Sequence, residues 1–187
     1  MLTSTTKMTA QQFLQLGEDP PGVRLELVNG EVAVSPSPIP DHSTVIIKLI
    51  TLLENYNEAN DFGELYQDVD TILDRFNVRR PDVLFFFNAR TYLVGKKAME
   101  GPPDLAVEVI SPSSVEIDRE DKFIQYRDAG VANYWIIDPA IKTIDAWQLA
   151  KSQYVQVGHA QGEETIKLPP FPDLEISLGR LWRRRRN

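Results

Sequence analysis

Two carboxylates lie inside short apolar runs of the sequence. Asp82 stands near the start of the run 81–87 (PDVLFFF), and Glu108 lies in the run 104–110 (DLAVEVI). Runs of this kind are typical of buried central strands. An ionised carboxylate in such a strand costs on the order of several kcal/mol unless it is paired, hydrogen-bonded or bound to a metal. Both side chains therefore need partners.

Strand geometry predicts that these carboxylates share a site. Side chains alternate between the two faces of a strand, so Glu108 shares a face with the even-numbered residues of its run. If 81–87 is the neighbouring strand, Asp82 projects to the same face at one end of the sheet. Two carboxylates there suit a hard divalent cation such as Mg²⁺, which takes oxygen ligands and keeps several waters. The backbone carbonyl of Val109 is a candidate third ligand.

Each carboxylate also has a purely structural interpretation. Asp82 could accept backbone hydrogen bonds in a turn after Pro81. Glu108 could instead form a buried ion pair. The candidate cations for that pair are Arg79, Arg80 and Lys122. The residue types alone favour the metal site and the ion pair equally.

A β-hairpin is predicted near the N-terminus. Residues 24–28 and 31–35 are strand-like, and the Asn29-Gly30 pair between them is a strong hairpin-turn signal, because both residues tolerate positive φ. A short helix over 9–17 is expected to precede the hairpin. These elements lie before the apolar runs that carry the two carboxylates.

Two longer helices are predicted on either side of those runs. Asp41 can cap a helix over 41–59, whose apolar residues recur at i, i+3 and i+4 along one face. A second helix is expected over 118–129, because Gly130 can end it in the left-handed conformation. Helices with one apolar face pack on a sheet.

The rest of the pattern predicts strands. Period-two alternation over 63–73 suits a half-exposed strand. Further strands are expected at 134–138, 141–149, 154–157 and 164–168. Together, these elements predict a single α/β domain over residues 1–187, with a mixed β-sheet flanked by helices and an N-terminal β-hairpin.

The charge distribution does not favour binding of nucleic acid by charge alone. The chain has 20 basic and 27 acidic residues and a net charge of −7. Arg180 and Arg183–Arg186 place five of the basic residues among the last eight positions, so the rest of the chain is still more acidic. Phosphate binding rests on clustered Lys and Arg. A nucleic-acid-binding role would require a local function for some acids, and the tail 183–187 would be either a basic handle or a flexible solvated segment.

Several protein classes are excluded by what the sequence lacks. Without cysteine there are no disulfides, thiolate nucleophiles, cysteine zinc sites or iron–sulfur clusters. The GxxxxGK[ST] and GxGxxG fingerprints are missing. With two histidines and no GxSxG, a Ser-His-Asp hydrolase has little support. Because neither a signal peptide nor a run of ~20 apolar residues is present, we expect a soluble cytoplasmic protein.

The order of several short motifs resembles a known family. These motifs are RPDV (80–83), LAVEVISP (105–112), DK (121–122), YRDAGV (126–131), YW (134–135) and DP (138–139). The series is similar to a large Uma-type family of restriction-endonuclease-like proteins, expanded in cyanobacteria, within the PD-(D/E)XK nuclease superfamily. The similarity runs from the hairpin at Leu25 to the strand at Tyr154. It implies a restriction-endonuclease-like fold.

The resemblance also assigns roles to individual residues. Asp82 matches the metal-binding Asp of the first motif, and Glu108 matches the acidic residue of the second. The lysine expected two residues after Glu108 is replaced by Ile110. Many relatives carry this lysine on the next helix, where Lys122 occupies the fitting position. The implied catalytic residues are Asp82, Glu108 and Lys122, and the implied metal ligands are Asp82, Glu108 and the Val109 carbonyl.

The implied activity is Mg²⁺-dependent hydrolysis of phosphodiester bonds, with DNA as the expected substrate. Mg²⁺, or Mn²⁺ in its place, would activate a bound water and neutralise charge on the phosphate, while Lys122 orients the water or stabilises the transition state. A homodimer is expected, because a double-strand cut needs two active sites. The alternative is a catalytically inactive relative that acts as a binding or assembly module, which the missing lysine and the acidic composition suggest.

Three further groups are secondary candidates. His42 matches a His of the family's pattern and could contact the scissile phosphate or assist a water, or else be an exposed first-turn residue. Glu26 or Glu31 could add a metal ligand, but the hairpin turn between them leaves the choice open. Candidate phosphate contacts are Arg79, Arg80, Lys96 and Lys97. The two lysines lie in the stretch 88–103, which is equally typical of a solvated loop.

Overall fold

The structure is a computed structural model that describes residues 7–36, 39–112 and 114–182. The basic tail 183–187 and part of the proline-rich stretch before the long helix lie outside these residues. Within the described part, no helix combines the length and the apolar character needed to cross a membrane.

The largest sheet has six strands in the order β10-β9-β8-β7-β6-β3. β7 and β8 are parallel, whereas the other neighbours are antiparallel. The strands are β3 (Gly63–Tyr66), β6 (Val83–Phe87), β7 (Leu105–Val109), β8 (Asn133–Asp138), β9 (Thr143–Ala150) and β10 (Gln153–Gln161). The predicted α/β class with a mixed sheet is confirmed.

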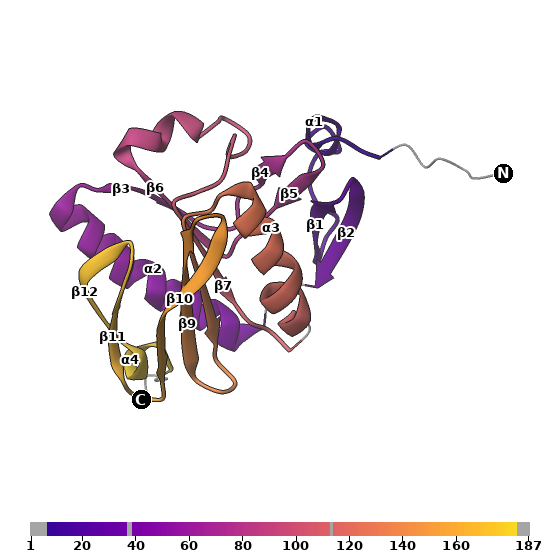
Figure 1. Cartoon of the computed structure of the whole chain (residues 1–187). Helices are drawn as coiled ribbons and strands as arrows, with labels where there is room; N and C mark the ends of the chain where they lie inside the picture. The colour runs from indigo at the N-terminus through magenta and orange to yellow at the C-terminus, as the bar shows by residue number, and fades with distance from the viewer. Residues whose placement is uncertain (1–6, 37–38, 113, 183–187) are drawn as a thin grey trace.

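Helices cover both faces of this sheet (Figure 1). On one face, Val107 of β7 packs in a core shared with α2 (Pro40–Asn60). On the other face, Ala106 packs in a core shared with α3 (Lys122–Ala129). The period-two alternation predicted for this strand is therefore confirmed, and Glu108 belongs to the face that α3 covers.

The spacing of apolar residues explains how α2 docks on the sheet. Val45, Leu49 and Leu53 recur every four residues and are buried, because side chains at this spacing lie on one side of a helix. Pro40 occupies the first turn, where its missing N–H leaves no hydrogen bond unmade. Asp61 ends the helix in the left-handed conformation, with φ 51°.

A second sheet has four strands in the order β2-β1-β5-β4. Its strands are β1 (Val23–Val28), β2 (Glu31–Pro36), β4 (Thr71–Asp74) and β5 (Asn77–Arg79). β1 and β2 form the predicted hairpin, and its turn residues Asn29 and Gly30 have φ of 53° and 83°. The short helix α1 (Ala10–Phe13) packs on this sheet, with Phe13 beside Leu27.

The C-terminal part closes the α2 side of the molecule. β11 (Thr165–Leu168) and β12 (Phe171–Ser177) form a two-stranded sheet, and α4 (Leu178–Trp182) follows. Phe171 and Leu181 are buried in the core that α2 shares with the six-stranded sheet. Neither β12 nor α4 was predicted from the sequence.

The prediction of one strand over 63–73 is wrong. This stretch forms two strands in different sheets, β3 in the six-stranded sheet and β4 in the four-stranded sheet. Between them Asp68 has φ 53°, a left-handed conformation that interrupts an extended chain. The alternation continues across this break, so it could not reveal that the chain passes from one sheet to the other.

The boundaries of the first two helices also differ from the predicted ones. α1 ends at Phe13 and does not continue to Gly17. α2 begins at Pro40 with Ile39 as its N-cap, so Asp41 lies inside the first turn. An acidic residue still favours this position, because its charge complements the positive end of the helix dipole.

The predicted helix over 118–129 is not α-helical throughout. It begins with a π-turn, η2 (Ile117–Asp121), and continues as α3. Gly130 ends it with φ 87°, as predicted. Part of the expected loop over 88–103 is likewise ordered, as the 3₁₀-helix η1 (Asn88–Leu93).

Candidate active site

Asp82 and Glu108 lie opposite each other on neighbouring segments of the sheet. The antiparallel register of β6 and β7 pairs Val83 with Val107, so one further step sets Asp82 opposite Glu108. The backbone N–H of Val109 donates to Asp82 Oδ2 at 2.8 Å. The two acidic residues are 5% and 1% exposed. The structure thus brings the two carboxylates to one end of the sheet.

Two residues of α3 engage both oxygens of Glu108. Lys122 Nζ donates to Glu108 Oε2 at 2.8 Å, and Tyr126 OH donates to Oε1 at 2.6 Å. Burial raises the pKa of Glu108 above its ordinary value, and the charge of Lys122 opposes that shift. Of the three cations considered for an ion pair with Glu108, Lys122 is the one that forms it.

The ammonium of Lys122 lies between two buried carboxylates. It is 2.8 Å from Glu108 Oε2 and 2.9 Å from Asp118 Oδ1. Burial alone would lower the pKa of Lys122, but Glu108, Glu26 and Asp118 raise it above its ordinary value. The side chain is therefore a charged donor, and it enters the site from the first turn of α3.

Asp82 is held by side chains from two other elements. His42 of α2 lies with Nε2 3.0 Å from Asp82 Oδ2, and Arg24 of β1 donates through Nη1 to Oδ1 at 3.3 Å. Burial alone would raise the pKa of Asp82, but His42, Lys122 and the Val109 N–H hold it below its ordinary value. Asp82 is accordingly ionised at neutral pH.

His42 belongs to the interior of this site. Its exposed fraction is 5%, so the interpretation as an exposed first-turn residue is wrong. Among the described residues, its second ring nitrogen, Nδ1, has no hydrogen-bond partner. The contact with Asp82 makes His42 a neighbour of the candidate metal ligands.

The structure distinguishes the two glutamates of the hairpin. Glu26 is buried, with Arg79 Nη1 at 2.9 Å from Oε2 and the Arg80 N–H donating to Oε1 at 2.9 Å. Glu31 is exposed. Glu26 is therefore the hairpin glutamate that faces the site.

The four candidate phosphate contacts divide into two pairs. Arg79 is 2% exposed and is bound by Glu26 and by Gln125, the latter at 2.6 Å. Arg80 is paired with Asp19 at 2.5 Å and Asp70 at 2.9 Å. Both arginines are thus engaged within the protein.

Lys96 and Lys97 differ from the two arginines. They are exposed, just beyond η1. Solvent-facing lysines can reach a phosphate without breaking an internal ion pair. Of the four candidates, Lys96 and Lys97 are therefore the ones that could contact a phosphate in this way.

A hollow of about 180 Å³ opens beside Asp82. Its lining consists of Arg24, His42, Ser43, Ile46, Ile47, Gln67, Asp68 and Asp82. Glu108 does not line it. Of Asp82 and Glu108, Asp82 is therefore the one through which the site meets the surface.

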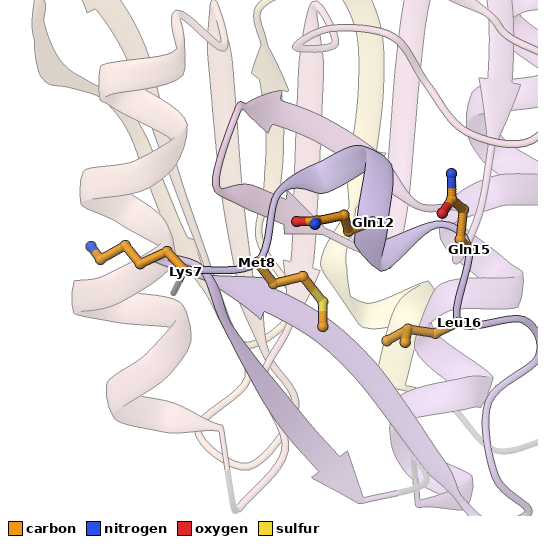
Figure 2. A pocket seen from close by; sticks show the side chains of 5 residues that line it. All are labelled: Lys7, Met8, Gln12, Gln15 and Leu16. Carbon is orange, nitrogen blue, oxygen red and sulfur yellow. The ribbon is translucent and has the colours of Figure 1, made fainter. Parts of the chain in front are cut away.

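A larger hollow of about 420 Å³ lies at the N-terminal segment (Figure 2). Its lining consists of Lys7, Met8, Gln12, Gln15 and Leu16, the residues labelled in Figure 2. It offers neither a carboxylate nor an imidazole. The chemistry predicted from the sequence therefore belongs to the smaller hollow at Asp82.

The oxygen donors at Asp82 and Glu108 fit a hard cation. A carboxylate has about four lone-pair positions that can accept a hydrogen bond or bind a cation. The contacts described above engage three of these positions on Asp82 and two on Glu108, so each carboxylate keeps at least one position for a cation. In the described part of the chain, no group of three or more His, Asp or Glu side chains is arranged to hold a metal ion. A Mg²⁺ at this site would therefore keep several of its waters, as this ion commonly does.

Three residues of the site were not singled out from the sequence. Arg24 contacts Asp82 across 58 positions of the chain, and no sequence pattern indicates such a contact. Asp118 and Tyr126 lie four residues before and after Lys122. Because residues four apart on a helix are neighbours, this spacing was a usable signal.

The mixed sheet and its flanking helices form a restriction-endonuclease-like fold. Residues 10–179 match the Uma2 family, described as "Putative restriction endonuclease", and the chain belongs to this family. The resemblance inferred from the motifs is thereby confirmed.

The fold has a counterpart among solved structures. The chain is similar to a "putative nuclease" from Anabaena variabilis, with a TM-score of 0.77 and 18% identity, covering 94% of this chain and 97% of that one. At this identity the likeness shows a shared fold. No curated protein matches the chain.

Proposed function

We propose that the protein is a Mg²⁺-dependent endonuclease that hydrolyses phosphodiester bonds, with DNA as its substrate. The observation that carries the proposal is the meeting of Asp82 and Glu108 on one end of the sheet, with Lys122 2.8 Å from Glu108. Nuclease chemistry uses these residue types to hold a cation and to stabilise charge on a phosphate. Membership of a restriction-endonuclease family supports the proposal.

The candidate ligands of the Mg²⁺ are Asp82, Glu108 and the carbonyl of Val109. When bound, the ion supplies a water of lowered pKa and offsets charge on the attacked phosphate. Lys122, kept charged by its carboxylate neighbours, donates to a phosphate oxygen or orients the attacking water. Tyr126 holds Glu108 in place through its 2.6 Å hydrogen bond.

The cleavage test uses plasmid DNA, single-stranded DNA and RNA as separate substrates. Each is incubated with the purified protein in Mg²⁺, in Mn²⁺ and in EDTA. We expect cleavage of DNA with either cation and none in EDTA. Cleavage that persists in EDTA would contradict metal dependence, and cleavage of RNA alone would contradict the choice of substrate.

The role of Lys122 is tested by Lys122→Met, which keeps the length of the side chain and removes its charge. We expect the cleavage rate to fall by at least about 100-fold, a loss typical of removing one transition-state donor. Lys151→Met is the matched control, because Lys151 is exposed in the turn between β9 and β10. Circular dichroism shows whether each variant is folded.

The second candidate function is a non-catalytic module that binds nucleic acid or a protein partner. The observation in its favour is that both Glu108 oxygens are already engaged by Lys122 and Tyr126. This alternative predicts no cleavage of any substrate in Mg²⁺, and its nucleic-acid-binding form also predicts DNA retention. We also propose a homodimer, which light scattering of the purified protein tests directly.

A further inference from the structure

Asp118 is a buried carboxylate to which the proposed chemistry assigns no role. It is 2% exposed and lies in the π-turn η2, just before α3. Its Oδ1 is 2.9 Å from Lys122 Nζ. Among the described residues, this oxygen has no aligned hydrogen-bond donor. The nearby charge of Lys122 is therefore what compensates it.

The backbone of Asp118 is held in place independently of Lys122. Its N–H donates to the Ser114 carbonyl at 2.8 Å, and its own carbonyl accepts from Tyr134 OH at 2.7 Å. The N–H of Lys122 donates to the Ile117 carbonyl, which closes the wide i→i+5 turn. π-turns of this kind occur frequently at functional sites. Asp118 thus presents its carboxylate to the ammonium from a fixed position.

We propose that Asp118 is a positioning residue that holds the Lys122 ammonium beside Asp82 and Glu108. A lysine stem is flexible and its ammonium carries three N–H donors. A single carboxylate therefore restrains the distance of the ammonium from that carboxylate, but not the direction in which the ammonium lies. Asp118 and Glu108 restrain it from two different elements. If Glu108 directed an oxygen to a cation, Asp118 would still hold the ammonium. The inference rests on the proposed nuclease function for its catalytic consequence.

Steady-state cleavage tests that consequence with three variants. Asp118→Asn removes the charge at constant shape, Asp118→Glu restores it, and Asp121→Asn is the control, because Asp121 is exposed in the same turn. We expect Asp118→Asn to lower kcat at least tenfold with KM nearly unchanged. Asp118→Glu should recover part of the loss, and the control should match the wild type. A folded Asp118→Asn protein with wild-type kcat would overturn the inference.

Nitrogen-15 NMR of the Lys122 ammonium tests the positioning without requiring activity. The ammonium resonance of Lys122 is assigned by its absence in Lys122→Met. We expect the ammonium protons to be protected from exchange with water in the wild type and in Asp121→Asn. Protection should be lost in Asp118→Asn and retained in Asp118→Glu. If the wild type cleaves nothing but this pattern appears, the nuclease proposal fails and the positioning stands. Equal protection in Asp118→Asn would overturn the positioning, whatever the cleavage result.

Discussion

Glu26 and Arg79 form a buried ion pair next to the candidate active site. Their side chains are 6% and 3% exposed, and Arg79 Nη1 lies 2.9 Å from Glu26 Oε2. Because Glu26→Gln leaves the arginine buried without a countercharge, we expect it to lower the free energy of unfolding by about 3 kcal/mol at pH 7. Glu31→Gln, on the exposed side of the same hairpin, should change it by less than about 0.5 kcal/mol. Urea unfolding measures both.

The same pair should make stability depend on pH. Burial alone would raise the pKa of Glu26, but Lys122, Arg79 and the Arg80 N–H hold it below its ordinary value. The contribution of Glu26 is then present above the unfolded pKa of about 4.3 and is lost as pH falls through the lower folded value. The stability difference between wild type and Glu26→Gln should shrink as pH falls below about 4. A difference that stays constant with pH would contradict the assignment.

At the residue scale, the sequence led to the carboxylates but not to all of their partners. Asp82 and Glu108 could be predicted because acids are unusual in apolar strands. The choice between Glu26 and Glu31 could not be predicted, because the alternation of side chains between the two faces of a strand is not carried through a hairpin turn. Arg24 was missed because its contact with Asp82 depends on tertiary packing of distant segments.

β3 reaches the edge of the six-stranded sheet through a close backbone contact at Gly63. A Cβ there would lie 1.9 Å from the Phe86 carbonyl oxygen. Gly63→Ala should therefore lower the free energy of unfolding by about 1–3 kcal/mol, as overpacking does. Gly179→Ala is the control, since its Cβ would lie 3.4 Å from the Glu163 side chain and the change should stay within about 0.5 kcal/mol. Equal melting temperatures of the two variants would contradict this account.

At the element scale, the strands with apolar runs, regular alternation or a distinct turn could be predicted. The hairpin β1–β2, the strands β6, β7 and β8, and the later strands β9, β10 and β11 belong to this group. β5 has only three residues, and β12 is a strand because it pairs with β11. The π-turn η2 was missed as well, since helical spacing does not distinguish it from an α-helical turn.

At the scale of the whole molecule, the acidic charge should make DNA binding weak and dependent on the basic tail. The net charge is −7 even with the arginines at 183–186 included, which lie outside the described residues. Deleting 183–187 should weaken DNA retention and reduce the slope of log K against log salt by up to about 3.6, because four arginines are removed. Filter binding over a range of salt concentrations measures this slope. Unchanged binding would show that the tail is incidental.

Asp82 and Glu108 are the carboxylates of the proposed metal-dependent catalytic site. The most direct test of this assignment is the Mn²⁺ dependence of plasmid cleavage by wild type, Asp82→Asn and Asp104→Asn. Asp104 is the matched control, because it is also buried, with an exposed fraction of 7%. It lies away from the site, and its Oδ1 is paired with Arg90 Nη1 at a distance of 2.8 Å. We predict that Asp82→Asn abolishes cleavage at every Mn²⁺ concentration while folded Asp104→Asn cleaves like the wild type. Wild-type cleavage by folded Asp82→Asn would contradict the account.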